Sequence, residues 1–416
     1  MTSIETAAVI GLGYIGLPTA AILATNGINV IGVDVNQSTV DAVNRGEVPF
    51  VEPDLGVHVA GAVSQGHLKA TQDTPAAQAY IVAVPTPFRD DRSADLSFIE
   101  AAARGIAPQL QGGELIILES TSPPRATRHL AEYLLDLRPD LSLDGAGGSP
   151  VIHVAHCPER VLPGRVMIEL VTNDRIVGGL TPEAASLARD LYAVFCKGEI
   201  LMTDDVTAEM AKLVENSYRD VNIAFANELS VISSKLDIDV WELIRLANHH
   251  PRVNILNPGP GVGGHCIAVD PWFIVSAAPT ESRLIKTARE VNDAKPGWVV
   301  SEVVAVVESL VHGAEVAVLG LAFKANIDDL RESPAIEIAV DLASKLTGNK
   351  INIAEPHVRE LPSRLQGLEN VELMDPIAAV RRSAAVVLLV DHEAFRDVAV
   401  HLDGKLLVDT RGFFKG

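Results

Sequence analysis

The sequence predicts an α/β protein with two doubly wound (Rossmann-like) domains joined by a long central helix region. Short apolar runs typical of buried strands alternate with helical stretches at both ends of the chain. Residues 203–250 carry a helical pattern without strands. At 416 residues the chain exceeds one ordinary core. We expect three regions, 1–202, 203–311 and 312–416.

Composition narrows the class of protein. Hydrophobic residues make up 48% and charged residues 21%, as in a globular α/β protein. The net charge of −20 argues against nucleic acid or an anionic membrane as partner, because either requires a basic face. Neither a signal peptide nor an apolar run long enough to span a membrane is visible, and three widely spaced cysteines fit a reducing compartment. A cytoplasmic location is expected.

The individual elements follow from the apolar runs. The first strand is expected at 7–11, a helix follows it, and a second strand ends at position 34, which completes a βαβ unit. The remaining strands are expected at 79–85, 114–120, 151–156, 315–320, 350–356, 384–392 and 405–410, and the long helices at 204–238 and 281–311.

A dinucleotide site is predicted at the first strand. "GLGYIG" places Gly11, Gly13 and Gly16 between a strand and a helix whose amino-terminal amides suit a pyrophosphate. Asp34 ends the next strand, where a carboxylate meets a ribose 2′-hydroxyl and repels a 2′-phosphate. The motif therefore favours NAD over NADP. The alternative is a purely structural turn, with Asp34 an ordinary strand-end residue.

Two further strand ends would face the same crevice. They carry Thr86 in "VPTP", and Ser120 and Thr121 in "ESTSPP". Ligands collect at the carboxyl ends of parallel strands. Ordinary turn chemistry explains these residues equally well from position alone.

Cys266 stands apart from the other two cysteines. Cys157 and Cys196 are expected to be small buried hydrophobes. Cys266 lies in "NPGPGVGGHCIAVDPW", whose glycines suggest a loop held against a ligand, with His265 and Asp270 nearby for proton transfer. A thiol needs a cationic neighbour to be a good nucleophile at neutral pH.

The central helix and a loop in the first region offer partners. Lys212 and Asn216 are four residues apart and project from one helical face, where they could stabilise an oxyanion. The alternative is a solvated lysine on an amphipathic surface. The segment "HCPERVLPGR" provides Glu159 and Arg165, and the Glu159 carboxylate could activate a water or could equally be an exposed turn residue.

Seven ordered motifs together resemble the nucleotide-sugar 6-dehydrogenase family, which includes the UDP-glucose and GDP-mannose dehydrogenases. They are GLGYIG, VPTP, EST, CPERVLPGR, AKLVENSYR, GPGVGGHCIAVDP and GLAFKANIDDLRESPA, and they cover essentially the whole chain. Residues 249–275 are most similar to members that act on UDP-N-acetyl-D-mannosamine. The resemblance implies an NAD-binding first region, a dimerising central region with the catalytic loop, and a UDP-sugar-binding third region.

The resemblance also assigns roles. Cys266 is the nucleophile, Lys212 and Asn216 stabilise the oxyanion, Asp270 assists proton transfer, and Glu159 with Thr121 positions the hydrolytic water. Residues implied to hold NAD are Gly11, Gly13, Tyr14, Ile15, Gly16, Asp34, Thr86, Thr121, Lys324 and Arg331. Residues implied to hold the sugar nucleotide are Glu159, Arg160, Val161, Lys212, Asn216, Arg252, Asn254, Gly261, Gly263, His265, Phe323 and Lys324. No metal is implied.

Two departures and two rival functions accompany this interpretation. Val269 replaces a lysine of the UDP-glucose branch, which makes glucose a less suitable sugar than an N-acetylhexosamine such as mannosamine or glucosamine. Pro124 and Arg125 replace an expected Val-Gly, so the resemblance does not fix the shape of the loop after Thr121.

The two rival functions are a two-electron hydroxyacid dehydrogenase, which would not need Cys266, and a sensor that binds NAD or sugar nucleotide without turnover. A homodimer or higher homo-oligomer is expected from the apolar central helix.

Overall fold

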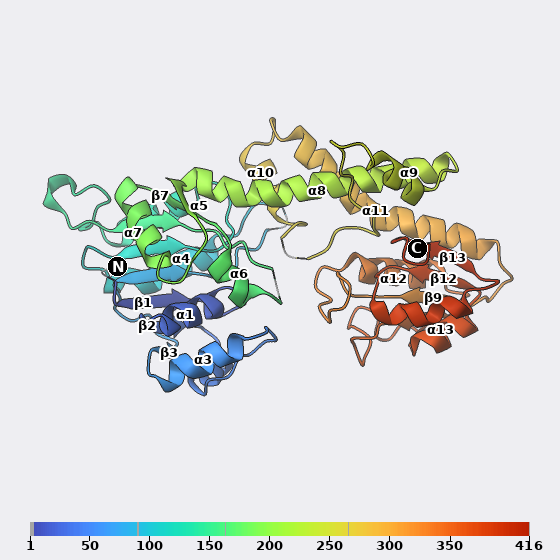
Figure 1. Ribbon diagram of the computed structural model, residues 1–416, viewed down its shortest axis with the longest axis horizontal. Helices are drawn as coiled ribbons and strands as arrows, with labels where there is room; N and C mark the ends of the chain where they lie inside the picture. The colour runs from blue at the N-terminus through green and yellow to red at the C-terminus, as the bar shows by residue number, and fades with distance from the viewer. Residues whose placement is uncertain (1–3, 90, 163, 265, 416) are drawn as a thin grey trace. The chain divides into compact units, whose positions relative to one another are not determined.

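The computed structural model describes residues 4–415 apart from 90, 163 and 265 (Figure 1). The chain divides into two compact units, each containing one sheet. The first unit takes in the residues up to Glu215 together with Trp272–Ala278, and the second takes in Asn216–Pro271 and the residues from Pro279 onward.

The first unit is built on an eight-stranded sheet in the order β3-β2-β1-β4-β5-β6-β7-β8. All neighbouring strands are parallel except β6 and β7, which are antiparallel. The strands are β1 Thr6–Ile10, β2 Asn29–Val33, β3 Leu68–Thr71, β4 Ala79–Val82, β5 Leu115–Leu118, β6 His153–His156, β7 Arg175–Gly179 and β8 Ile200–Asp204. The helices are α1 Gly16–Thr25, α2 Gln37–Asn44, α3 Leu55–Ser64, α4 Ser97–Ile106, α5 Ala126–Leu137, α6 Val166–Thr172 and α7 Pro182–Tyr192, with 3₁₀ turns at Ala107–Gln109 and Ala146–Gly148.

Helices cover both faces of this sheet, as the doubly wound prediction requires. Alternate residues of β1 enter opposite core layers: Ala7 and Val9 pack with α1 and α3, and Ala8 and Ile10 pack with α4 and α5. Every residue of β4 and β5 is buried. Strands buried on both faces are typical of parallel sheets. The strand order changes direction between β1 and β4, which creates a crevice at their carboxyl ends.

The central helices begin and end at identifiable signals. Helix α8 runs over Asp205–Lys235 without an internal Gly or Pro, and a left-handed Asp237 (φ 57°) follows it. Asp239 caps α9, Val240–Ala247, by accepting the backbone N–H groups of Trp241 and Glu242. Two further helices are α10, Asp270–Ala277, and α11, Arg283–Glu308.

The second unit contains a smaller parallel sheet in the order β11-β10-β9-β12-β13. Alternate residues of β9 again enter two core layers. Both doubly wound sheets predicted from the sequence are therefore confirmed. The strands are β9 Val316–Leu319, β10 Ile351–Ala354, β11 Val371–Leu373, β12 Ala385–Leu388 and β13 Leu406–Asp409, and the helices are α12 Pro334–Lys345, α13 Pro376–Arg382 and the 3₁₀ helix η3 Glu393–His401.

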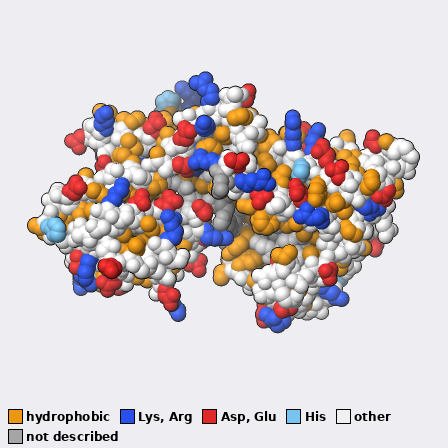
Figure 2. Space-filling model, turned by 180° about the vertical axis from the view of Figure 1, so that it is seen from behind, with side chains coloured by type: hydrophobic (Ala, Val, Ile, Leu, Met, Phe, Trp, Pro, Cys, Tyr) orange, Lys and Arg blue, Asp and Glu red, His pale blue; other side chains and the backbone are white. Residues whose placement is uncertain are grey.

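Charges are mixed on the surface. On the face shown in Figure 2, acidic and basic side chains are interspersed with apolar ones. Within the described residues, no helix has the length and apolar character needed to cross a lipid bilayer.

Candidate active site

The glycine motif forms a tight turn between β1 and α1. Gly11 has φ +94° and donates its N–H to the Val33 carbonyl at 2.8 Å. A Cβ on Gly11 would lie 2.6 Å from the Ala83 carbonyl oxygen, and one on Gly16 would overlap the Gly11 carbonyl oxygen. These two glycines are therefore required by the fold itself.

Gly13 differs, because a Cβ there would meet no described atom within 4 Å. No side chain among the described residues caps the first turn of α1, so its amides remain oriented for an anion. Ile15 is the residue at this N-cap, and the exposed ring of Tyr14 stacks on Phe50 with centroids 4.2 Å apart. The turn fits the pyrophosphate of a dinucleotide.

Asp34 is fixed at the end of β2. Its Oδ2 accepts the Leu12 N–H at 2.9 Å, and its Oδ1 accepts the Asn36 N–H at 2.8 Å. The carboxylate is partly exposed, so each oxygen keeps a lone pair for a ligand. This arrangement suits a ribose diol and disfavours a phosphate.

Two hydroxyls follow β4 and β5 at the same edge. Thr86 Oγ1 is buried and has no hydrogen-bond partner within the described parts of the chain, which fits a group awaiting a ligand. Ser120 Oγ instead donates to the Val84 carbonyl at 2.5 Å, so it links the two strand ends. Thr121, the next residue, is half-buried.

The loop after Thr121, where Pro124 and Arg125 replace the expected Val-Gly, contains one left-handed residue. Arg125 adopts φ 75°, the left-handed conformation that an expected glycine would favour. The Glu209 carboxylate of α8 holds the turn by accepting the N–H groups of Arg125 and Thr127 at 2.5 and 2.7 Å. The Glu209 side chain thus stabilises the turn in which Arg125 stands at the position of the expected glycine.

Glu159 lies three residues beyond β6 and is buried, with 7% of its surface exposed. Its Oε2 accepts from Arg175 at 3.3 Å and its Oε1 from the Arg160 N–H at 2.6 Å. The Arg160 side chain forms an ion pair with Glu215 on α8, and Val161 is half-buried beside it. Glu159 is therefore an oriented carboxylate and not an exposed turn residue. Arg165 has an exposed side chain that pairs with Glu169 at 3.5 Å.

In the second unit, the structure brings Asn216, Asp270 and the Cys266 backbone together. The Asn216 amide donates to Asp270 Oδ2 at 2.5 Å, and the buried Asp270 donates its own N–H to the Cys266 carbonyl at 2.8 Å. Cys266 is exposed, whereas Cys157 and Cys196 are buried as predicted. Lys212 is half-buried and lies one turn before Asn216 on α8. His265 lies outside the described residues.

The loop glycines have a packing role that the sequence did not reveal. A Cβ on Gly261 would lie 2.9 Å from Pro334, and a Cβ on Gly263 would overlap the Glu332 carbonyl oxygen. Gly264 faces the ring of Phe323. These glycines bring the cysteine loop against residues 323–334, and their contact with a sugar remains a prediction.

Arg289 of α11 contacts the cysteine loop, and sequence reasoning missed it. It is completely buried, pairs with Asp220 at 2.5 Å and donates to the carbonyl of Ile267 at 3.2 Å, next to the cysteine. Asn248 was also missed: its side chain exchanges two hydrogen bonds with Ile255 and so holds the exposed loop of Arg252 and Asn254. Neither residue belongs to a motif that identifies such a role.

The third group of predicted residues lies on the loop after β9. Lys324 and Arg331 are exposed there, and Arg331 pairs with Asp329 at 2.6 Å. Phe323 donates its N–H to the Asp329 carbonyl at 3.2 Å, which closes the loop. The structure therefore gathers Phe323 with the cysteine loop and leaves Lys324 accessible to a ligand.

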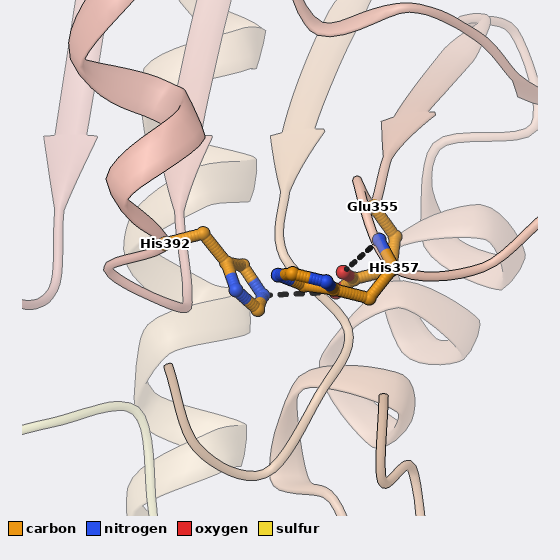
Figure 3. Close-up of side chains that lie close together, drawn as sticks. All are labelled: Glu355, His357 and His392. Carbon is orange, nitrogen blue, oxygen red and sulfur yellow. Dashed lines mark hydrogen bonds and ion pairs between the residues drawn. The ribbon is translucent and has the colours of Figure 1, made fainter. Parts of the chain in front are cut away.

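A buried carboxylate and two histidines lie at the base of this loop (Figure 3). Glu355 accepts the N–H groups of Leu321 and Ala322 at 2.7 and 3.1 Å, and His392 Nε2 lies 3.1 Å from it. His392 Nδ1 accepts the Asn326 N–H at 2.9 Å, so Nε2 carries the proton donated to Glu355. Both ring nitrogens of His392 therefore make hydrogen bonds that fix the loop, and neither of them has a lone pair directed at an ion.

Sequence comparison matches three models of one family along the chain. The NAD binding domain of the UDP-glucose/GDP-mannose dehydrogenase family matches residues 5–196, its central domain residues 206–294, and its UDP binding domain residues 317–416. The chain is 56% identical to an NDP-N-acetyl-D-galactosaminuronic acid dehydrogenase of Ralstonia nicotianae, over 99% of this chain and 96% of that relative.

Similarity extends to mannosamine enzymes and to solved structures. A UDP-N-acetyl-D-mannosamine dehydrogenase of Escherichia coli is 51% identical over 99% of this chain and all of that relative. The structure of a UDP-D-ManNAc dehydrogenase from Pyrococcus horikoshii superposes with a TM-score of 0.85 at 36% identity, covering 98% of this chain and 96% of the other. The chain belongs to the UDP-glucose/GDP-mannose dehydrogenase family and is an NAD-dependent nucleotide-sugar dehydrogenase.

Proposed function

We propose that this protein oxidises the C6 alcohol of UDP-N-acetyl-D-mannosamine to the uronic acid, in a four-electron reaction that passes through a Cys266 thioester. The observation that carries the proposal is the Asn216–Asp270 hydrogen bond beside an exposed Cys266. A sugar nucleotide would be held by residues of the third region, among them Phe323 and Lys324. The regions 1–202, 203–311 and 312–416 take the NAD, central and UDP-sugar roles in this proposal.

The residues around the glycine turn fit NAD, which when bound accepts the hydride in each of the two oxidations. Gly13 and the first turn of α1 would hold the pyrophosphate and Asp34 the ribose. The Thr86 hydroxyl, which has no hydrogen-bond partner among the described residues, would bind a further polar group. Tyr14, Ile15 and Thr121 border the same edge. Lys324 and Arg331 complete the proposed set.

The proposed role of Cys266 is to retain the aldehyde between the two oxidations. Its thiolate adds to C6 and forms a thiohemiacetal, and loss of a second hydride gives a thioester. The oxyanion of each adduct is stabilised by the Lys212 ammonium and the Asn216 amide, which Asp270 orients. Hydrolysis adds one water, positioned by Glu159 and Thr121, and releases the acid and the thiol.

The decisive measurement is the number of NADH molecules released per sugar nucleotide at completion. Two per UDP-N-acetylmannosamine is the expected value, since two hydrides leave C6. UDP-N-acetylgalactosamine is tested in parallel, because the Ralstonia relative favours a galactosamine compound as the second candidate. UDP-N-acetylglucosamine and UDP-glucose complete the set. One NADH per sugar would indicate a two-electron hydroxyacid dehydrogenase, and none with any sugar would favour a sensor.

The cysteine step is tested separately. Cys266→Ala should abolish uronate formation, whereas Cys196→Ala, at a buried cysteine, serves as the matched control. Cys266→Ser should stall as an ester, because an oxygen ester hydrolyses less readily than a thioester. Unchanged uronate formation in Cys266→Ala refutes the thioester route.

We also propose that the protein acts as a homodimer or higher homo-oligomer through α8. Tyr218, Phe225 and Ile232 are 72%, 53% and 45% exposed and recur every seven residues on one face of the helix. Such an exposed apolar stripe is typical of a surface covered by another protein. Light scattering should give at least a dimer for the native chain and a smaller mass for Phe225→Glu. A monomeric native chain would refute the proposal.

A further inference from the structure

The first residue of the antiparallel strand β7, the buried Arg175, lies at the same edge of the first sheet as Glu159. The β6 and β7 register pairs Ala155 with Gly179 and His156 with Gly178, and its continuation places position 175 opposite position 159. Because β7 runs against its neighbour, its first residue lies beyond the carboxyl end of β6. Arg175 therefore occupies the edge at which Glu159 lies.

Arg175 has contacts that fix it in one orientation. Only 4% of its surface is exposed, and its guanidinium lies 4.6 Å from the centroid of the Tyr192 ring. Its Nη2 donates to Glu159 at 3.3 Å, and its Nη1 donates to the sulfur of Cys157 at 3.5 Å. Burial raises the pKa of the Cys157 thiol to about 12, so this sulfur contributes no charge at neutral pH.

A second carboxylate lies near the other terminal nitrogen of the same guanidinium. Glu119, one residue beyond β5, is completely buried, and its Oε1 lies 3.7 Å from Arg175 Nη1. Tyr192 donates its hydroxyl to Oε1 at 3.2 Å, and Oε2 lacks a hydrogen-bond partner in the described structure. Burial, and then the charge of Glu159, raise the pKa of Glu119 to about 8.

We propose that Arg175 is the positioning residue that holds Glu159 for thioester hydrolysis, and that Glu119 governs how firmly Arg175 does so. The inference rests on the proposed function of Glu159. Nη1 of the guanidinium faces Glu119 and Nη2 faces Glu159, so its one positive charge attracts Glu159 most strongly when Glu119 is neutral. At neutral pH Glu119 retains its proton and Arg175 pairs with Glu159. As Glu119 ionises, it draws Arg175 away and the orientation of Glu159 loosens.

The groups that face Glu119 come from four elements. They are Arg175 of β7, Tyr192 of α7, the Cys157 and Glu159 side chains after β6, and the Thr19 hydroxyl of α1. Tyr192 is held neutral by burial, which raises its pKa well above the ordinary value. The ionisation of Glu119 therefore alters the charge balance around Arg175 above pH 8.

The first test measures covalent occupancy of Cys266 during turnover. The full-length chain is mixed with UDP-N-acetylmannosamine and NAD, quenched in acid and analysed by intact mass spectrometry. Glu159→Gln and Arg175→Met should both accumulate the acylated enzyme. Arg175→Met should lower the hydrolysis rate by about 10²-fold, the loss expected for a misplaced group, with KM for the sugar changed less than about twofold. Arg175→Lys should recover part of the rate, because lysine keeps the positive charge but lacks the planar guanidinium that can donate to several acceptors at once.

Each outcome separates the inference from the function on which it rests. Accumulation in Glu159→Gln without accumulation in Arg175→Met overturns the inference alone. Absence of accumulation in Glu159→Gln overturns both the assignment of Glu159 and the inference. A uniform loss of both oxidations with a lower melting temperature would assign Arg175 a structural role only. If Arg175→Met does not fold, Arg175→Lys is judged by the same readout.

The second test is the pH profile of hydrolysis. The ratio of the hydrolysis rate at pH 9 to that at pH 7 should be low in the native chain and several-fold higher in Glu119→Gln, which cannot ionise. Glu114→Gln is the matched control, because Glu114 is a buried carboxylate at the other end of the same strand, bonded to the N–H groups of Gln111 and Gly112. An unchanged ratio in Glu119→Gln would overturn the role given to Glu119.

Discussion

Replacing Arg289 by Met should strongly destabilise the second unit. Arg289 is the buried cation of the pair with Asp220, which is also completely buried. Without it, Asp220 Oδ1 keeps only the Asn292 amide at 2.8 Å, and Oδ2 already lacks a partner among the described residues. Breaking a buried ion pair from one side costs about 3–5 kcal/mol, because it leaves an uncompensated charge. For a unit of this size that corresponds to about 6–20 °C in melting temperature.

The stability loss of Arg289→Met should depend on pH, because it comes from the ionised form of Asp220. Burial raises the pKa of Asp220 to about 6 even beside Arg289, and loss of the arginine raises it further. A carboxyl whose folded pKa is raised binds its proton more tightly in the native state, so stability falls as pH rises from about 4 towards the folded pKa. The deficit of Arg289→Met should therefore be largest at pH 7 and smaller at pH 5.

Chemical denaturation of the native chain, Arg289→Met and the double variant Asp220→Asn with Arg289→Met measures these differences. The double variant should recover much of the loss, because it removes the charge that was left unpaired. A loss below about 1 kcal/mol in Arg289→Met, or a double variant no more stable than the single one, would refute the reasoning.

Three further outcomes follow from the geometry. Gly263→Ala should destabilise the chain by about 1–3 kcal/mol and lower activity, because its methyl group overlaps the Glu332 carbonyl oxygen; a variant of native stability and activity would contradict this. Arg125→Gly should stabilise the chain by about 1 kcal/mol in denaturation, since φ 75° strains an L-residue; destabilisation would show that the arginine side chain matters more. Iodoacetamide should label one thiol per native chain at pH 7.5, the exposed Cys266, while burial keeps Cys157 protonated with a pKa near 12; peptide mapping would reveal a second labelled site.

The strands that the sequence predicted are those with continuous apolar runs. Strands β1, β4, β5 and β9 are almost wholly buried, and a buried parallel strand is uniformly apolar. Strand β7 escaped prediction because "RIVGG" begins with an arginine and ends with two glycines. The glycines are needed because a Cβ on Gly178 would overlap the Asp204 carbonyl oxygen of β8. Such a contact depends on tertiary packing and leaves no periodic signal.

The candidate site was predictable in part for a similar reason. The turn from Gly11 to Asp34 is local, so spacing alone indicates it. Asn216 and Asp270 are 54 residues apart; the family resemblance assigned both to one site, but their hydrogen bond was not predicted. Arg175 belongs to no motif, and its partners Glu119 and Glu159 lie in the loops that follow two other strands. Long-range charge pairing of this kind appears only when the fold is known.

Both sheets have the same type of glycine turn after their central strand, but the carboxylates that bind these turns differ in burial and in hydrogen bonding. Gly11 follows β1 and Gly320 follows β9, and both glycines have φ +94°. The next residue in each case donates its N–H to the carboxylate just after the neighbouring strand, Asp34 in the first sheet and Glu355 in the second. Asp34 retains acceptor capacity, whereas Glu355 is buried and its oxygens accept from three amides and His392. Of these two turns, both within the described residues, the first keeps the acceptor capacity that a ribose requires, and calorimetric titration should therefore saturate at one NAD per chain. Under the proposed four-electron oxidation, the substrate must therefore stay bound to the chain while the first NADH leaves and a second NAD enters.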